Sequence, residues 1–269
     1  MTKATNIYLD LTRQFNAGRL RAVLAGGQAM VLHRLAMMSK DGDWILREEN
    51  ETFQHVLAIL ERYGAHYRFC APLDTRWMSG GWSSHLEFAW RGLRIRADFF
   101  TRPPRLTSDD LARLWAEQAD QDIPHASAQD LAEMKKTLRE KDYPAIGELA
   151  RLIPNAEGQI LYSRSARDLL ELAGKHPARF RMLSAQRPAL RSAKDGLSAL
   201  EAALDAERRE FIHADEQRLA RYSAAAEAWA ALWPEVEREV AGKSLPEAHA
   251  IMVRRAADCL PARVPEDKP

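Results

Sequence analysis

The stretch LAGGQAMVLHRLAMMSKDGDWIL, residues 24–46, decides the fold. A short apolar run ends at the glycine pair Gly26 and Gly27, and apolar residues then recur at the three- and four-residue spacing of a helix. Asp41 and Asp43 lead into a second apolar run, which predicts another strand. The stretch therefore predicts a strand, a glycine turn, a helix and a strand, with two carboxylates at the head of the second strand.

The residues that follow add a helix and three strands. Apolar residues keep helical spacing over 51–63, and the composition of 66–73 predicts a strand. Strict alternation over 86–90 and 93–99 predicts an antiparallel pair of strands joined by a tight two-residue turn, Arg91-Gly92. The predicted order, β-α-β-α-β-β-β, is that of a mixed sheet.

A boundary is predicted at Pro103-Pro104, because consecutive prolines cannot donate hydrogen bonds to a sheet. Beyond it the sequence predicts helices over 127–138 and 143–153, and helical spacing across 199–240 that Pro234 is expected to interrupt. We therefore predict an α+β protein with a mixed-sheet N-terminal domain and a C-terminal α-helical domain. The predicted parts are an α/β domain, 1–105, a helical extension, 106–155, and a C-terminal helical domain, 156–269.

The overall charge gives no argument for nucleic-acid binding, because 39 Lys and Arg nearly cancel 38 Asp and Glu in the 269 residues. Arginines do gather locally, in the part of the chain that follows residue 160. They form either a phosphate-facing patch or an ordinary solvated helical surface. The arginines concerned are Arg164, Arg167, Arg179, Arg181, Arg187 and Arg191.

The number of cysteines and the lengths of the apolar stretches indicate the cellular compartment of the protein. Cys70 and Cys259 are too few for a disulfide framework or a zinc site, which favours a reducing environment. The longest apolar stretch, 22–38, is interrupted by His33 and Arg34 and is too short to span a bilayer. We therefore expect a cytoplasmic protein without a membrane partner.

Three carboxylates carry the functional hypothesis. Residues two apart in a strand point to the same side, so Asp41 and Asp43 hold a divalent ion between them if the segment is extended. Asp98, in a later strand-like run, joins them if its strand lies beside theirs. Magnesium prefers a few carboxylates together with substrate phosphate oxygens, and two such ions activate a hydroxyl and stabilise a leaving pyrophosphate. The alternative interpretation is an ordinary β-turn, since Asp-Gly favours tight turns.

These residues resemble the motifs of the DNA polymerase beta-type nucleotidyltransferase superfamily. Its small members carry a Gly-Gly or Gly-Ser pair at a helix start, then Asp-x-Asp at the head of a strand, then a third Asp on a later strand. Gly26 and Gly27 match the first element, Asp41 and Asp43 the second, and Asp98 the third. The resemblance implies a nucleotidyltransferase-like N-terminal domain and covers roughly residues 20–153.

Single positions near the Asp pair also bear on the resemblance. Many bacterial relatives have a His before the Asp pair, which His33 matches, and Ser39 stands where they often have Thr. Arg34 and Met37 depart from the pattern, because the relatives commonly have Gly after the His and a basic residue a few positions on.

A second segment, 127–152, is similar to the helix pair of abortive-infection-type nucleotidyltransferase toxins and their uncharacterised bacterial relatives. In those families a Lys and an Arg face the nucleotide phosphates. If the first helix continues, Lys135 and Arg139 lie four apart on one of its faces. The alternative is a solvated, charged helix end. The matching residues are Lys135, Lys136, Arg139, Lys141 and Asp142.

The resemblance implies transfer of a nucleoside monophosphate from a nucleoside triphosphate to a hydroxyl on RNA, protein or a small molecule, in a toxin, antitoxin or defence setting. Asp41 and Asp43 would bind magnesium, with two ions expected. Asp98 would assist the second ion or act as base. The expected nucleotide contacts are Gly26, Gly27, Ser39, Lys135, Lys136, Arg139 and Lys141.

Two rival hypotheses stay open. In the first, the chain is a catalytically degenerate module of this fold that binds nucleic acid or a protein partner; Met37 and the irregular motif favour it. In the second, it is a structural or antitoxin-like partner of another chain.

Overall fold

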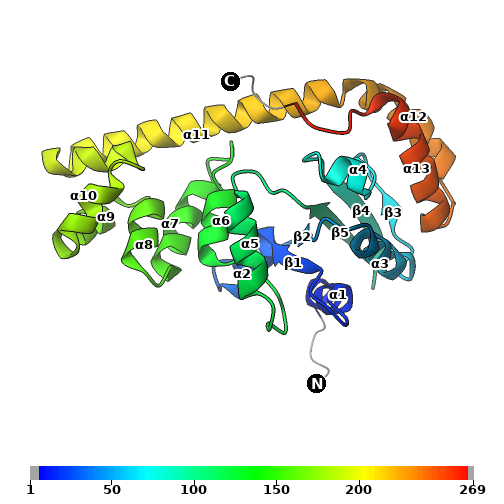
Figure 1. Ribbon diagram of the computed structural model, residues 1–269, viewed down its shortest axis with the longest axis horizontal. Helices are drawn as coiled ribbons and strands as arrows, with labels where there is room; N and C mark the ends of the chain where they lie inside the picture. The colour runs from blue at the N-terminus through cyan, green and yellow to red at the C-terminus, as the bar shows by residue number, and fades with distance from the viewer. Residues whose placement is uncertain (1–5, 266–269) are drawn as a thin grey trace. The chain divides into compact units, whose positions relative to one another are not determined.

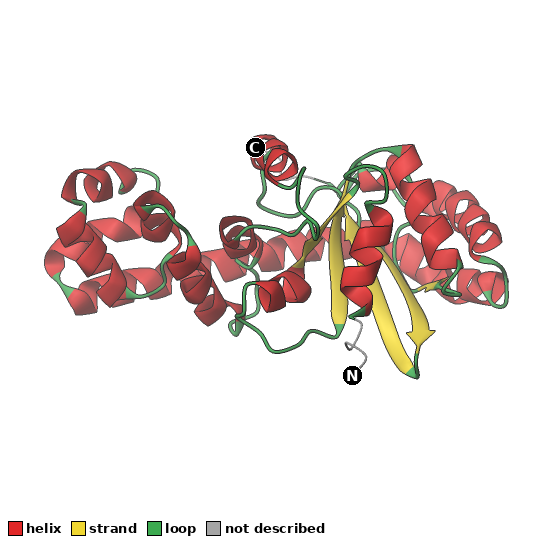
Figure 2. Ribbon diagram, turned by 90° about the horizontal axis from the view of Figure 1, so that it is seen from below, coloured by secondary structure: helices red, strands yellow, loops and turns green. Residues whose placement is uncertain are grey.

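The computed structural model describes residues 6–265, and its five strands form one mixed sheet (Figures 1 and 2). The sheet order is β1-β2-β5-β4-β3, with β2 and β5 parallel and the other neighbouring pairs antiparallel. The predicted α+β class is confirmed. The strands are β1 (Ala22–Ala25), β2 (Asp41–Leu46), β3 (His66–Tyr67), β4 (Ser84–Trp90) and β5 (Leu93–Phe100).

The described part of the chain divides into two compact units. The first consists of the residues up to 125 together with those from 220 onward, and the second of residues 126–219. The predicted parts 1–105, 106–155 and 156–269 group residues differently, and that division stays a prediction. The helices of the first unit are α1 (Ile7–Phe15), α2 (Gly26–Leu32), α3 (Asn50–Glu61), α4 (Thr75–Met78), α5 (Ser108–Glu117), α12 (Glu227–Val240) and α13 (Leu245–Cys259).

One face of the sheet forms the core of the first unit. Trp44 of β2 is stacked on Phe99 of β5 at 5.5 Å between ring centroids, and Phe15 of α1 meets the Trp44 ring edge-on. All three side chains are fully buried. The indole N–H of Trp44 donates to the buried hydroxyl of Thr12, so the polar group in this core is satisfied. Residues 41, 43 and 98 alternate with these apolar positions and point to the other face.

Helices α12 and α13 complete the same core. Trp229 and Val236 of α12 and Met252 of α13 are buried in it. The indole N–H of Trp229 donates to the carbonyl of Cys70, and that of Trp77 donates to the carbonyl of Leu260. These contacts join segments far apart in the sequence, which local patterns do not predict.

The prediction that Pro234 interrupts the helical segment was wrong. Helix α12 runs through Pro234, and the break lies at Ala226, between α11 and α12. The proline removes the hydrogen bond that the carbonyl of Ala230 would accept. Pro234 and Ala230 are both exposed, so water can satisfy that carbonyl and the helix tolerates the loss.

The second unit is helical and has its own core. Ile160, Leu169, Leu183, Leu190 and Leu200 are buried together in it. A long helix, α11, continues beyond residue 219, so that its last residues belong to the first unit. The elements are α6 (Ala128–Met134), α7 (Asp142–Leu152), α8 (Ala156–Tyr162), α9 (Ala166–Lys175), α10 (Pro177–Leu183), the 3₁₀ helix η1 (Pro188–Asp195) and α11 (Leu197–Ala225).

Several predicted boundaries shift. Strand β2 begins at Asp41, earlier than the apolar run suggested, so both carboxylates lie inside the strand. The strand predicted over 66–73 is limited to His66–Tyr67. The helix predicted over 127–138 ends at Met134, because the residues after it turn toward Asp142.

Candidate functional site

The carboxylates of Asp41, Asp43 and Asp98 share one face of the sheet. The register of β2 and β5 places Asp43 beside Asp98, and Asp41 lies two residues before Asp43 on the same strand. Burial, followed by the negative charges of Asp98 and Asp41, raises the pKa of Asp43 to about 6. The site is therefore a concentration of negative charge, which a divalent cation would relieve.

The glycine pair is shaped around Asp43 and Ser39. Gly26 has φ +53°, and a Cβ atom there would lie 1.9 Å from Oδ2 of Asp43. A Cβ atom on Gly27 would lie 2.2 Å from the hydroxyl of Ser39. The backbone N–H of Gly27 donates to the carboxylate of Asp43, which partly offsets the rise in its pKa. Any larger residue at either position would displace the side chain it faces.

Asp98 is held by two residues that the sequence analysis did not single out. Nη2 of Arg68 donates to Oδ1 of Asp98, and Nδ1 of His85 lies 2.8 Å from the same oxygen. Burial alone would raise the pKa of Asp98, but the interactions with His85 and Arg68 outweigh it and hold that pKa below its ordinary value. Asp98 is consequently ionised over the whole physiological range.

A sequence signal for His85 did exist. The predicted two-residue turn pairs residue 90 with residue 93, and counting back along the hairpin pairs His85 with Asp98, as the structure does. Arg68 offered no such signal, because no short turn fixes the register of β3.

Asp41 is the third carboxylate of the site and the first residue of β2. Its Oδ1 is buried without a hydrogen-bond partner among residues 6–265, although Nη1 of Arg96 lies 3.5 Å away. Magnesium is often held by one or two carboxylates together with substrate phosphates. Asp41 and Asp43 fit that requirement. In the described part of the chain no group of three or more His, Cys, Asp or Glu side chains forms a ready metal cluster, in keeping with Asp98 being engaged by Arg68 and His85.

A cavity of about 420 Å³ lies beside Asp41 in the first unit. Ser39 and Lys40, the residues immediately before Asp41, form part of its wall, and the hydroxyl of Tyr8 donates to the carbonyl of Lys40. Met37 and Met38 also line it, with exposed fractions of 99% and 75%. Met37, which departs from the motif, is thus a surface residue at an apolar cavity.

The basic residues predicted from the second segment all lie in the second unit. The expectation that Lys135 and Arg139 share a helical face was wrong, since both lie in the loop between α6 and α7. They instead flank one carboxylate: Nζ of Lys135 and Nε of Arg139 lie 3.1 and 3.0 Å from Asp142. Lys136 pairs with Glu133 at 2.6 Å, and Lys141 is exposed. Their role in nucleotide binding stays a prediction.

Comparisons with known proteins give two solved structures of low similarity. No protein-family model matches the chain, and no curated protein sequence matches it. A crystal structure described as a "putative nucleotidyltransferase from H. pylori" is 12% identical with a TM-score of 0.38, covering 81% of this chain and 98% of that one. The structure of JHP933 from Helicobacter pylori is 13% identical with a TM-score of 0.37, covering 80% and 94%. At these values neither similarity bears on activity.

The lengths and compositions of the helices bear on membrane insertion. Among residues 6–265, no helix combines the length and the apolar character that crossing a bilayer requires.

Proposed function

We propose that this protein is a metal-dependent nucleotidyltransferase, which transfers a nucleoside monophosphate from a nucleoside triphosphate to a hydroxyl group. The observation that carries the proposal is the convergence of Asp41, Asp43 and Asp98 on one sheet face beside a glycine turn that closely fits Asp43. Arg68 and His85 balance the charge of Asp98, whereas burial and the two neighbouring carboxylates penalise the ionised form of Asp43. A bound cation would relieve that cost.

Each carboxylate has a separate task in this proposal. Asp41 and Asp43 would hold magnesium, which would shield the negative charge of the triphosphate. Asp98, kept ionised by Arg68 and His85, accepts the proton of the attacking hydroxyl. A bond forms between the acceptor oxygen and the α-phosphorus, the bond between the α-phosphorus and its bridging oxygen breaks, and pyrophosphate leaves.

The nucleotide contacts and the acceptor are finer parts of the proposal. Gly26, Gly27 and Ser39 stand next to the carboxylates and are the contacts that the site geometry favours. The acceptor class (RNA, protein or small molecule) and a toxin or antitoxin role come from the sequence resemblance alone.

Calorimetric titration with each of the four ribonucleoside triphosphates, with and without magnesium, tests the proposal. We expect magnesium-dependent binding of at least one of them and its loss in the Asp41→Asn/Asp43→Asn variant. Asp122→Asn is the matched control, because Asp122 is an exposed carboxylate that pairs with Arg13. No magnesium-dependent binding by folded protein, or equal binding by the double variant, would contradict the proposal.

A further inference from the structure

A basic groove lies in the second unit, beside α9, α10 and η1. Its volume is about 490 Å³. Apolar side chains line it, including Phe180 and Leu190, and we call them its apolar floor; three cations also line it: Arg181, Arg191 and Lys194. The surrounding sequence is strongly biased, since residues 172–194 include six Lys or Arg and no Asp or Glu. The groove therefore combines an apolar surface with uncompensated positive charge.

Two arginines of this region are structural and do not belong to the groove surface. Arg187, just before η1, is buried and donates to the carboxylate of Glu207 and to the carbonyl of Ile160. Nη1 of Arg164 lies 2.5 Å from the same Glu207 carboxylate. These pairs tie the start of η1 to α8 and α11, which fixes the wall that carries Arg191 and Lys194.

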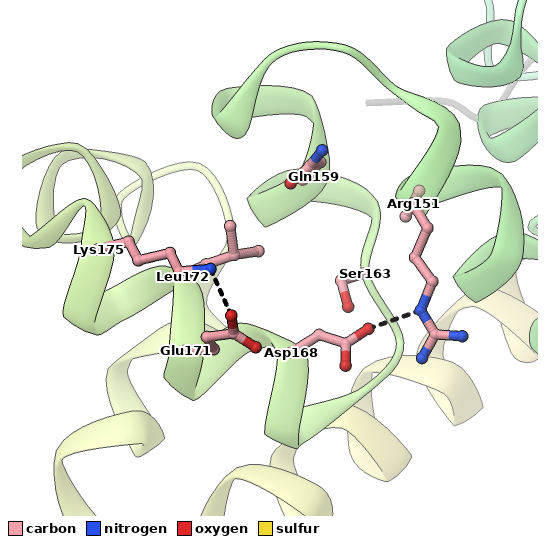
Figure 3. A pocket seen from close by; sticks show the side chains of 8 residues that line it. Arg151, Gln159, Ser163, Asp168, Glu171, Leu172 and Lys175 are labelled. Carbon is pink, nitrogen blue, oxygen red and sulfur yellow. Dashed lines mark hydrogen bonds and ion pairs between the residues drawn. The ribbon is translucent and has the colours of Figure 1, made fainter.

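The three cations of the groove are available to a ligand. Arg181, Arg191 and Lys194 are exposed, and none of them forms an ion pair with a carboxylate in the described part of the chain. A neighbouring cavity of about 160 Å³ shows the contrast (Figure 3). There Arg151 pairs with Asp168 at 2.9 Å and Lys175 pairs with Glu171, so its charges cancel. An anionic ligand is thus attracted to the groove and not to that cavity.

We propose that the basic groove binds a single-stranded nucleic acid. Single strands present regularly spaced phosphates together with flat, apolar base faces, and proteins that bind them combine cations with apolar or aromatic surfaces. The groove offers both in one place: Arg181, Arg191 and Lys194 contact phosphates, and the apolar floor accommodates a base. A duplex hides its base faces, and an acidic peptide has none, so neither uses the floor.

Fluorescence anisotropy of a labelled oligouridine RNA and a labelled oligothymidine DNA, titrated with the full chain, tests this proposal. The test variant is Arg181→Gln/Arg191→Gln/Lys194→Gln. We expect it to lose at least tenfold in affinity near 0.1 M salt. The dependence of log affinity on log salt should become shallower by about 2, since each lost phosphate contact removes about 0.7 for single strands.

Two control variants separate site-specific binding from general charge. Arg167→Gln/Arg208→Gln/Arg209→Gln removes the same charge from positions of the same unit that do not line the groove, and it should bind as the unaltered chain does. Arg181→Lys/Arg191→Lys keeps the charge and should retain most of the affinity. Melting curves establish that all variants are folded.

Three results would overturn the proposal: no binding of either strand by the unaltered chain, equal loss in the test and control variants, or equal affinity for a duplex or polyglutamate. The groove shares no residue with the carboxylate site. RNA binding that fails while nucleotide binding succeeds therefore refutes this inference alone.

Discussion

At the residue scale, the energetic centre of the candidate site is Asp43. Its carboxylate is fully buried and lies beside two further carboxylates, which together raise its pKa to about 6 even though the N–H of Gly27 donates to it. The ionised carboxylate of Asp43 lowers the stability of the folded protein. Such a cost is expected at a site where a bound cation balances the charge.

The pH dependence of stability follows from this. A carboxyl pKa raised from about 3.9 in the unfolded chain to about 6 in the folded chain adds stability only at low pH, and this contribution disappears as the pH rises through 6. In a magnesium-free buffer, Asp43→Asn should therefore raise the free energy of unfolding by about 2 kcal/mol at pH 8 and leave it nearly unchanged at pH 4. Urea denaturation at both pH values measures this, and an equal effect at both would contradict it.

The second residue-scale prediction concerns Gly26. Gly26→Ala should cost at least about 2 kcal/mol of stability and abolish magnesium-dependent nucleotide binding, because alanine at φ +53° is strained and its Cβ atom would displace the Asp43 carboxylate. Gly174→Ala is the control: Gly174 lies in α9 with open space around it, and the change should add about 0.5 kcal/mol. Denaturant midpoints compare the two, and similar midpoints would refute the argument.

At the element scale, a largely buried carboxylate joins three parts of the second unit. Glu207 of α11 pairs with Arg187 before η1 and with Arg164 after α8. Glu207→Gln should lower the free energy of unfolding by about 3 kcal/mol, because it leaves the buried Arg187 and the largely buried Arg164 without their counter-charge. Glu201→Gln, at an exposed position of the same helix, should change it by less than about 0.5 kcal/mol. Thermal melts distinguish the two; a small effect of Glu207→Gln would show that water or other groups compensate.

Helix α12 allows a prediction in the opposite direction. Pro234→Ala should stabilise the protein by roughly 1–3 kcal/mol, because alanine restores the hydrogen bond to the carbonyl of Ala230 and has no ring to crowd it. Denaturation curves of the variant check this. An unchanged midpoint would mean that the exposed helix has already adapted to the ring.

Local patterns predicted the elements that local chemistry controls. The strict alternation and tight turn gave the β4–β5 hairpin with its register, and the glycine pair gave the β1–α2–β2 connection. They did not predict Arg68 beside Asp98, or the loop that carries Lys135 and Arg139. Both depend on contacts with distant residues: Arg68 donates to Asp98, and the N–H of Leu138 in the loop donates to Asp215. The predicted register of the hairpin does pair His85 with Asp98, because both residues lie on strands joined by the short turn.

At the scale of the whole molecule, one unit is built from a single continuous segment of the chain and the other from two separate segments. Residues 126–219 are continuous and bury their own apolar core, whereas the sheet unit needs α12 and α13 from the other side of that segment. Residues 126–219 expressed alone should therefore unfold cooperatively on heating. A chain that ends at residue 219 should lose the cooperative transition of the sheet unit, because Trp229, Val236 and Met252 are missing from its core. Circular dichroism melts test both statements, and a cooperative sheet transition in the truncated chain would contradict the second.

Because the sheet unit consists of two segments separated by the helical unit, the order of synthesis on the ribosome affects its folding. Domains commonly fold in the order in which they are translated. Here the sheet unit is begun first, yet its core is closed by residues near 252–260, which emerge only after the helical unit is complete. The helical unit should thus fold first. The strands that carry Asp41 and Asp98 should keep part of their apolar face exposed to solvent until α12 and α13 have been synthesised and pack against the core.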